Sequence, residues 1–271
     1  MSKTIFITGT STGLGKETAI NFAKNGWNVV ASMRSPEKDK ELSSHKSVRV
    51  VKLDVTDILQ VKTAIAQAIA AFGKIDVVVN NAGVGMYGAL ELTEEKDIDN
   101  QYAVNVRGVI NVIRGFLPHF RQNKGGMFIN IGSVMGRTTA LPLGSLYNMS
   151  KFALEGLIEG LYYELKPLNI DVKLIEPGGF SSDFSSNIVF SKSDTITDYK
   201  VITEKVEVIL NAIAKNGSID TLKTIVTTIF DLANGKNTEF RTLVGEDAKM
   251  LLKLRESQSI ETFLESMSGQ F

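Results

Sequence analysis

The sequence predicts a single α/β domain in which helices cover both faces of a central parallel sheet of about seven strands. Short runs of β-branched and aliphatic residues alternate along the chain with longer segments of helical periodicity. This alternation is typical of doubly wound parallel sheets. No internal repeat, low-complexity segment or linker divides the 271 residues. We therefore expect one domain, 1–271, rather than two.

Seven segments are expected to form the strands. Those at 4–8, 77–81 and 127–131 are almost uninterrupted apolar runs, as expected for parallel strands that are buried on both faces. The other expected strands are 28–32, 48–53, 171–175 and, with a weaker pattern, 242–244.

Helices are expected between these strands. Apolar residues recur in steps of three and four across 106–120 and 154–165, which is the spacing of one helix face. Ser35 followed by Pro36 has the form of a helix N-cap and a first helical residue.

Two segments near the end of the chain differ from this pattern. Residues 178–198 are rich in Ser, Asp and Phe and have no clear period. A connection of that length inside a compact domain is usually functional, so we expect 178–215 to contain a substrate-binding loop or lid. The segment 246–271 is expected to be a helical tail.

Composition excludes several classes of protein. The 30 Lys and Arg residues balance 30 Asp and Glu residues, which removes the general electrostatic argument for binding nucleic acid or an anionic membrane. The absence of cysteine excludes disulfides, thiolate nucleophiles and Cys-ligated zinc, and two histidines supply little for a metal site. No run of about 18 apolar residues and no signal-peptide pattern is present. We expect a cytoplasmic enzyme or binding domain.

A glycine-rich turn follows the first expected strand. Gly9, Gly13 and Gly15 are spaced G-x-x-x-G-x-G, and a helical pattern begins directly after them. Glycines let the backbone approach a pyrophosphate, and a helix N-terminus offers free N–H groups and a positive dipole end. The alternative is a tight turn without a ligand. The position after the first strand of a βαβ unit favours a dinucleotide site.

The end of the second expected strand bears on the choice of dinucleotide. An acidic residue there would bind the ribose hydroxyls and repel a 2′-phosphate, but this chain has Arg34. A guanidinium pairs well with phosphate, so we expect NADP(H) rather than NAD(H), with Ser11, Ser32 and Ser35 as further donors. A solvated charge is the alternative for Arg34. Asp54 is expected to meet the adenine amino group or to cap the next helix.

A tyrosine and a lysine are spaced for proton transfer. Tyr147 and Lys151 lie four residues apart in a helical pattern, which places them on one helix face. A neighbouring ammonium lowers the pKa of a phenol, so the pair can serve as an acid or base. A buried tyrosine beside a surface lysine is the alternative. Ser133 follows a strand at the edge where such sheets bind ligands, and Asn105 lies early in the 106–120 helix or marks a kink.

These motifs resemble those of the short-chain dehydrogenase/reductase family, in its short form of about 250 residues. The likeness spans about 3–180 and, more weakly, 241–248. The turn 8–15 matches the family pattern TGxxxGxG, residues 80–83 match NNAG, and 177–178 match the PG segment. The family's catalytic tetrad is matched, in order and spacing, by Asn105, Ser133, Tyr147 and Lys151.

The resemblance implies a Rossmann fold and a role for each matched residue. Tyr147 would be the proton donor in reduction and the acceptor in oxidation, and Ser133 would hydrogen-bond the substrate oxygen. Lys151 would lower the Tyr147 pKa and hold the nicotinamide ribose, and Asn105 would position a water that links Lys151 to solvent. The residues expected to contact the dinucleotide are Gly9, Ser11, Thr12, Gly13, Leu14, Gly15, Arg34, Asp54, Val55, Asn81, Ala82, Gly83, Tyr147, Lys151, Pro177 and Gly178.

The chain departs from the family pattern at two positions. Where the family often has a threonine after the Pro-Gly segment, this chain has none, and Ser182 is expected to supply the hydroxyl instead. Thr12 stands where some NADP-dependent members have a basic residue, which leaves the 2′-phosphate mainly to Arg34. Family members are commonly dimers or tetramers, so a homo-oligomer formed through the helices at about 90–120 and 147–165 is expected.

The variable loops favour an apolar ketone, aldehyde or secondary alcohol as substrate. Arg137 is the exception that leaves acidic substrates open. The apolar residues expected to build this pocket, or alternatively to pack the lid on the core, are Met86, Tyr87, Met135, Leu141, Leu143, Phe180, Phe184, Ile188, Val189 and Phe190.

The sequence thus predicts an NADP(H)-dependent carbonyl reductase or alcohol dehydrogenase. A non-catalytic NADP(H)-sensing regulator on the same fold is the main alternative. A dehydratase or a sugar-nucleotide epimerase on this fold is a further one.

Overall fold

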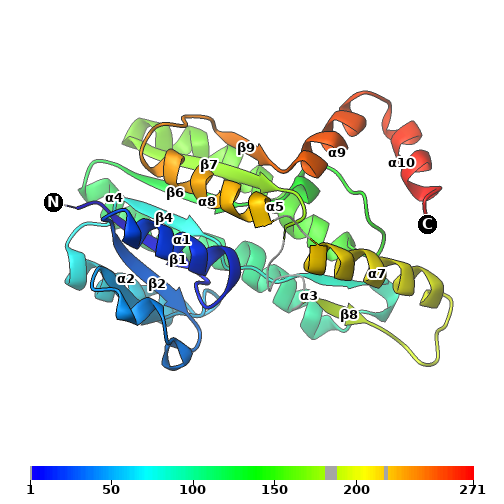
Figure 1. Ribbon diagram of the computed structural model, residues 1–271, viewed down its shortest axis with the longest axis horizontal. Helices are drawn as coiled ribbons and strands as arrows, with labels where there is room; N and C mark the ends of the chain where they lie inside the picture. The colour runs from blue at the N-terminus through cyan, green and yellow to red at the C-terminus, as the bar shows by residue number, and fades with distance from the viewer. Residues whose placement is uncertain (1, 181–187, 217–218) are drawn as a thin grey trace.

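The computed structural model describes residues 2–180, 188–216 and 219–271 (Figure 1). Its centre is a seven-stranded sheet in which every pairing is parallel and the strand order is β3-β2-β1-β4-β6-β7-β9. The strands are β1 (Thr4–Thr8), β2 (Asn28–Met33), β3 (Val48–Lys52), β4 (Val77–Asn80), β6 (Gly126–Ile131), β7 (Ile170–Pro177) and β9 (Arg241–Val244). The predicted doubly wound sheet is confirmed.

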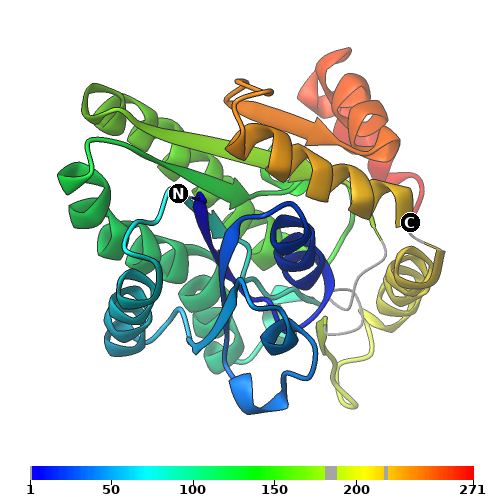
Figure 2. The ribbon, with the colours of Figure 1, turned by 60° about the vertical axis from the view of Figure 1, so that its left-hand side comes forward.

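Helices pack on both faces of this sheet. One face is covered by α1 (Gly13–Lys24) and α8 (Ile219–Ala233), which lie beside each other in Figure 2. The other face is covered by α2 (Ile58–Phe72), α4 (Gly108–Gln122) and α5 (Ser145–Leu165). Since both faces are covered, the central strands β1 and β4 are buried along their whole length.

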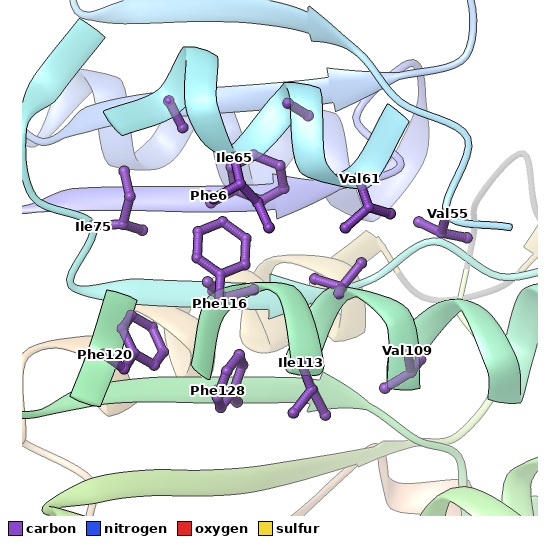
Figure 3. Close-up of a cluster of buried hydrophobic side chains, with 14 of the residues drawn as sticks. Phe6, Val55, Val61, Ile65, Ile75, Val109, Ile113, Phe116, Phe120 and Phe128 are labelled. Atoms are coloured by element: carbon purple, nitrogen blue, oxygen red, sulfur yellow. The ribbon is translucent and has the colours of Figure 1, made fainter. Parts of the chain in front are cut away.

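The larger core lies between the sheet and the second helical face (Figure 3). Phe116 of α4 is its centre, with its ring 4.9 Å from that of Phe6 on β1 and 6.0 Å from that of Phe120. Phe120 in turn contacts Phe128 of β6 at 4.8 Å. All four rings are fully buried, so this aromatic chain ties α4 to the middle of the sheet.

Outside the main sheet, two short strands pair with each other in parallel, namely β5 (Met86–Gly88) and β8 (Val189–Ser191). They lie with α7 (Lys200–Asn216) at one end of the molecule in Figure 1. The segment predicted as a loop or lid therefore contains a strand and a helix. Ser182 and Phe184 lie outside the described residues.

The remaining helices complete the chain. α3 (Glu95–Tyr102) continues through a wider, π-helical turn (Ala103–Arg107) into α4. α9 (Glu246–Glu256) and α10 (Ile260–Ser268) follow β9. The helix expected at Pro36 is a single 3₁₀ turn, Pro36–Lys38. Short 3₁₀ turns also occur at Leu42–Ser44, Leu90–Leu92, Val134–Gly136 and Lys166–Leu168. Among the described residues, no helix is long and apolar enough to span a membrane.

Candidate active site

A cavity of about 670 Å³ opens at the carboxyl ends of the strands. The sheet order runs outward from β1 on one side and from β4 on the other, and this reversal is where doubly wound folds bind ligands. All sixteen residues predicted to contact a dinucleotide line this cavity, as does Ser133. Asn105 does not line it.

The glycine turn has the geometry that an anion site needs. Gly9 and Gly13 adopt φ angles of 71° and 55°, which glycine reaches at little cost. A Cβ on Gly15 would overlap the carbonyl oxygen of Gly9 and the amide of Asn81. The Thr12 side chain makes no capping hydrogen bond to α1, so it does not occupy the first-turn N–H groups. These groups and the positive end of the α1 dipole face the cavity and fit a pyrophosphate.

Asn81 holds the turn in place from the neighbouring strand. Its Nδ2 donates to the carbonyl oxygens of Thr8 and Gly9, each at 2.9 Å. In addition, the hydroxyl oxygen of Thr8 accepts hydrogen bonds from the backbone N–H groups of Asn81 and Ala82, each at 3.0 Å. The two segments predicted to meet the dinucleotide are therefore locked to each other by hydrogen bonds.

Arg34 and Asp54, which are predicted to lie at the adenosine end of the dinucleotide, both line the cavity. Arg34 is exposed and makes no ion pair with any described residue, so its guanidinium is available to an anion. Asp54 Oδ1 accepts from the backbone N–H and hydroxyl of Thr56. Asp57, not Asp54, caps α2. Ser32 is fully buried and donates to the Ile7 carbonyl, so the expectation that it serves a phosphate is wrong.

Ser133, Tyr147 and Lys151 meet on the other side of the cavity. Ser133 follows β6 and accepts a hydrogen bond from the N–H of Met135. Tyr147 and Lys151 stand on successive turns of α5, with the Lys151 ammonium 5.8 Å from the centre of the Tyr147 ring. Lys151 Nζ donates to the carbonyl oxygen of Ile131, the last residue of β6, at 2.9 Å. The three side chains are buried.

Burial dominates the electrostatics of this pair. It raises the pKa of Tyr147 to about 12, and a hydrogen bond with Ser133 partly offsets that rise. Burial also lowers the pKa of Lys151 to about 8, against a smaller opposing effect of Glu155. We expected Lys151 to lower the Tyr147 pKa, but the groups of the chain alone do not produce that result. Desolvation of the buried phenol dominates, because burial disfavours its charged form.

Asn105 lies in the π-helical turn between α3 and α4 and is buried. Its Oδ1 accepts from the N–H of Val84 at 2.8 Å, and its Nδ2 donates to the Val84 carbonyl at 2.9 Å. Nδ2 also donates to the hydroxyl of Ser150 on α5 at 3.1 Å. Asn105 thus joins the loop after Gly83 to α5. The local break in the helix, which the sequence left as an alternative, is present.

The substrate side of the cavity is mostly apolar. Of the side chains expected there, Tyr87, Met135, Leu141, Phe180 and Ile188 line it. The others that the structure describes do not line it, namely Met86, Leu143, Val189 and Phe190.

Arg137 also lies outside the lining. Its guanidinium pairs with Glu176 at 3.3 Å and with Glu256 at 3.4 Å. The argument from Arg137 for acidic substrates therefore has no structural support.

Two late helices contribute lining residues that the sequence did not predict. Leu210 and Ile213 come from α7, and Asp247 and Leu251 come from α9. Asp247 Oδ2 accepts from the N–H of Gly179 at 2.6 Å, which ties α9 to the Pro-Gly segment. The apolar periodicity of α7 was the available signal, but it does not say where the helix packs.

Comparison with known proteins agrees with this geometry. A family model described as short chain dehydrogenase matches residues 3–192. A 3-ketodihydrosphingosine reductase from Bacteroides thetaiotaomicron is 34% identical over 255 residues, which cover 91% of this chain and 89% of the relative. A crystal structure of a short-chain dehydrogenase from Streptomyces avermitilis has a TM-score of 0.82 at 26% identity, covering 100% of this chain and 95% of that one.

Two further solved structures contain a nicotinamide dinucleotide. A 3-ketoacyl-(acyl-carrier-protein) reductase from Brucella melitensis, complexed with NADH, has a TM-score of 0.74 at 25% identity and covers 91% of this chain and 98% of that one. ElxO with NADP bound has a TM-score of 0.70 at 26% identity and covers 90% of this chain and 96% of that one. Relatives of this fold thus bind either dinucleotide. With its glycine turn, its cavity and the family model in agreement, the chain belongs to the short-chain dehydrogenase/reductase family of oxidoreductases.

Proposed function

We propose that this protein is an NADP(H)-dependent oxidoreductase that interconverts an apolar ketone or aldehyde and its alcohol, with Tyr147 as proton donor and acceptor. The observation that carries the proposal is that Ser133, Tyr147 and Lys151 line the same cavity as the glycine turn. A bound nicotinamide would supply or accept the hydride. The chain supplies orientation, exclusion of water and a proton.

Each of these residues is proposed to have a separate role in the reaction. A carbonyl oxygen within reach of both Ser133 and Tyr147 would accept two hydrogen bonds, which stabilise the negative charge that develops on it during reduction. Tyr147 then gives its proton to that oxygen, and in oxidation it takes the proton back. Lys151 stays close to the phenol ring, so its positive charge favours the phenolate form that is left behind. We assign Asn105 a supporting role through Ser150 and Val84.

NADP(H) is proposed over NAD(H) on the position of Arg34. The guanidinium borders the cavity without an ion-pair partner among the described residues. The 2′-phosphate of NADP(H), which NAD(H) lacks, would provide an anionic partner for this guanidinium.

The test is to titrate NADPH and NADH side by side. We expect NADPH to bind at least tenfold more tightly, worth about 1.4 kcal/mol. Arg34→Leu should remove most of this preference, whereas Arg49→Leu, an exposed arginine on β3 outside the cavity, should leave it. Equal losses of NADPH and NADH affinity in Arg34→Leu would refute the phosphate assignment.

An apolar substrate is proposed because the lining beyond Tyr147 is mostly aliphatic and aromatic. The Bacteroides relative named 3-ketodihydrosphingosine reductase puts long-chain ketones first in the screen. Carboxylates and phosphates rank last, because Arg137 does not line the cavity and pairs with Glu176 and Glu256.

The alternative function is an NADP(H) sensor without turnover, and Tyr147→Phe separates the two. An enzyme should lose its activity in Tyr147→Phe while it still binds NADPH. Tyr163→Phe, an exposed tyrosine on the same helix, is the matched control and should retain activity. Activity that survives Tyr147→Phe would contradict the proposed mechanism.

We also propose that the protein is a homodimer or homotetramer formed through α4 and α5. Met149, Phe152 and Tyr163 are exposed on α5, and a Cβ at Gly156 or Gly160 would meet nothing within 4 Å. Sedimentation analysis tests this, and a monomer at micromolar concentration would contradict it.

A further inference from the structure

Two glutamates are buried against each other behind the catalytic lysine. Glu155 lies one helical turn after Lys151 on α5, and Glu176 is the next-to-last residue of β7. Their side chains are 8% and 1% exposed, and an oxygen of each carboxyl group contacts Nε of Arg241. Neither side chain lines the cavity. Burying a charged carboxylate is costly unless it is paired, so such a pair requires an explanation.

Two arginines compensate the pair in part. Arg241 of β9 places its Nε 2.9 Å from Glu155 Oε2 and 3.3 Å from Glu176 Oε1. Arg137 contacts Glu176 Oε2 at 3.3 Å. Each arginine is also shared with an exposed carboxylate at the protein surface, Glu159 for Arg241 and Glu256 for Arg137. With Lys151, these are the charged groups that face the pair.

The compensation leaves two buried oxygens without a hydrogen bond. Glu155 Oε1 and Glu176 Oε1 accept none from any described residue, and only the second has an ion-pair contact. One proton held between the two carboxyl groups would satisfy both oxygens and remove one of the two buried charges. Burial raises the pKa of both groups, and the negative charge of Glu176 adds to the rise at Glu155, to about 7.

Glu155 also contacts the turn after β6 that carries Ser133. A Cβ on Gly132 would lie 3.2 Å from Glu155 Oε1, and one on Gly136 would lie 3.1 Å from Glu155 Cγ. Glu155 therefore packs beneath the segment that follows Ile131 and carries Ser133. Ile131 is also the residue whose carbonyl binds Lys151. Negative charge on Glu155 favours the protonated form of Lys151.

We propose that Glu155 and Glu176 share one proton, and that Glu155 is a positioning residue whose ionisation keeps Lys151 protonated as the pH rises above neutral. The proposal rests on the catalytic role assigned to Lys151 above. Below neutral pH the shared proton limits the buried negative charge. Above it, the proton leaves and a full charge appears one helical turn from the ammonium.

The shared proton can be tested without cofactor or substrate. Infrared spectroscopy of the whole protein in D₂O should show the C=O band of a protonated carboxyl at pH 6. This band should fade as the pH is raised to 8. It should be absent in Glu155→Gln and unchanged in Glu159→Gln, which removes the exposed partner of the same arginine. A wild-type protein without this band at pH 6 would overturn the shared proton, whether or not the protein is an enzyme.

The positioning role is tested by the pH profile of kcat for NADPH-dependent ketone reduction. Removing the Glu155 charge should move the alkaline limb to lower pH by about half a unit or more, the effect of two unit charges about 6 Å apart even in water. Glu159→Gln should leave the limb in place. Glu176→Gln leaves the Glu155 carboxylate in place and should leave the limb near its wild-type position, whereas Glu155→Ala removes the same charge if Glu155→Gln does not fold.

A role confined to packing would lower kcat equally at every pH. Superimposable alkaline limbs in wild type and the folded Glu155 variant would therefore overturn the positioning role. A wild-type protein that shows the infrared band but no turnover would refute the proposed function and leave the shared proton standing.

Discussion

Replacing Asn105 with alanine tests the link between the helical break and the site. The change removes three hydrogen bonds, two to the backbone of Val84 and one to the hydroxyl of Ser150. Gln101 Nε2 also donates to the Val84 carbonyl at 3.0 Å and to the Ser150 hydroxyl at 3.3 Å. Those two acceptors therefore keep a partner. Only the N–H of Val84 loses its bond outright.

The size of the effect follows from this count. One orphaned donor costs about 1–2 kcal/mol in a half-buried position, and two bonds with a remaining partner add about 0.5 kcal/mol each. Asn105→Ala should therefore lower the free energy of unfolding by about 2–3 kcal/mol. In a chain of this length that is a fall of about 4–12 °C in Tm.

The assay is urea and thermal denaturation of wild type, Asn105→Ala and the matched control Gln101→Ala. Gln101→Ala leaves every shared acceptor bonded to Asn105, so it should cost less than about 1.5 kcal/mol. Val84 lines the cavity, so Asn105→Ala should also weaken NADPH binding several-fold. Equal destabilisation by the two variants would refute the assignment of Asn105 as the principal clamp on Val84.

Three further outcomes follow from the same structure. Lys151→Met should abolish turnover yet raise stability at pH 7 by about 1–3 kcal/mol. Burial lowers the pKa of Lys151 from 10.5 to about 8. The free-energy cost of burying its charge is therefore fully present below pH 8 and is relieved as the pH rises towards the pKa of lysine in the unfolded chain. A Lys151→Met protein that is less stable than wild type in urea titration at pH 7 would contradict this. Gly15→Ala should lower NADPH affinity at least tenfold in a fluorescence titration, because the added methyl overlaps the Gly9 carbonyl and the turn must shift; an unchanged Kd would count against the turn as the pyrophosphate site. Phe116→Ala should cost about 3–5 kcal/mol in chemical denaturation, since the ring is fully buried among aromatic neighbours; a cost below 1 kcal/mol would mean that the core rearranges to fill the space.

The elements that the sequence predicted best are those with local signals. The strand at Thr4–Thr8 was placed to the residue, because a strand buried on both faces is an uninterrupted apolar run bounded by turn residues. Tyr147 and Lys151 share a helix face because the helical repeat fixes it. The helix expected at Pro36 is only a 3₁₀ turn. An N-cap residue and a proline can mark where a helix begins, but a longer helix also needs an apolar face that packs against the core.

Contacts between segments that are distant in the chain could not be predicted from the sequence. In the sequence, Arg137 is equally compatible with binding a substrate and with forming an ion pair. Its partners Glu176 and Glu256 are 39 and 119 residues away, and only the folding of β7 and α9 brings them near it. The same holds for Leu210 and Ile213, whose periodicity predicts a helix and not the cavity that it covers.

The sequence by itself determined the order of strands and helices, the glycine turn and the spacing of Tyr147 and Lys151, since each depends on neighbours within a few positions. Only the tertiary structure decided which charges are buried together. Glu155 and Glu176 become a pair because β7 lies under α5, and Arg241 joins them because β9 is the next strand of the sheet. Such electrostatics depend on burial and distance, and neither is a property of local sequence.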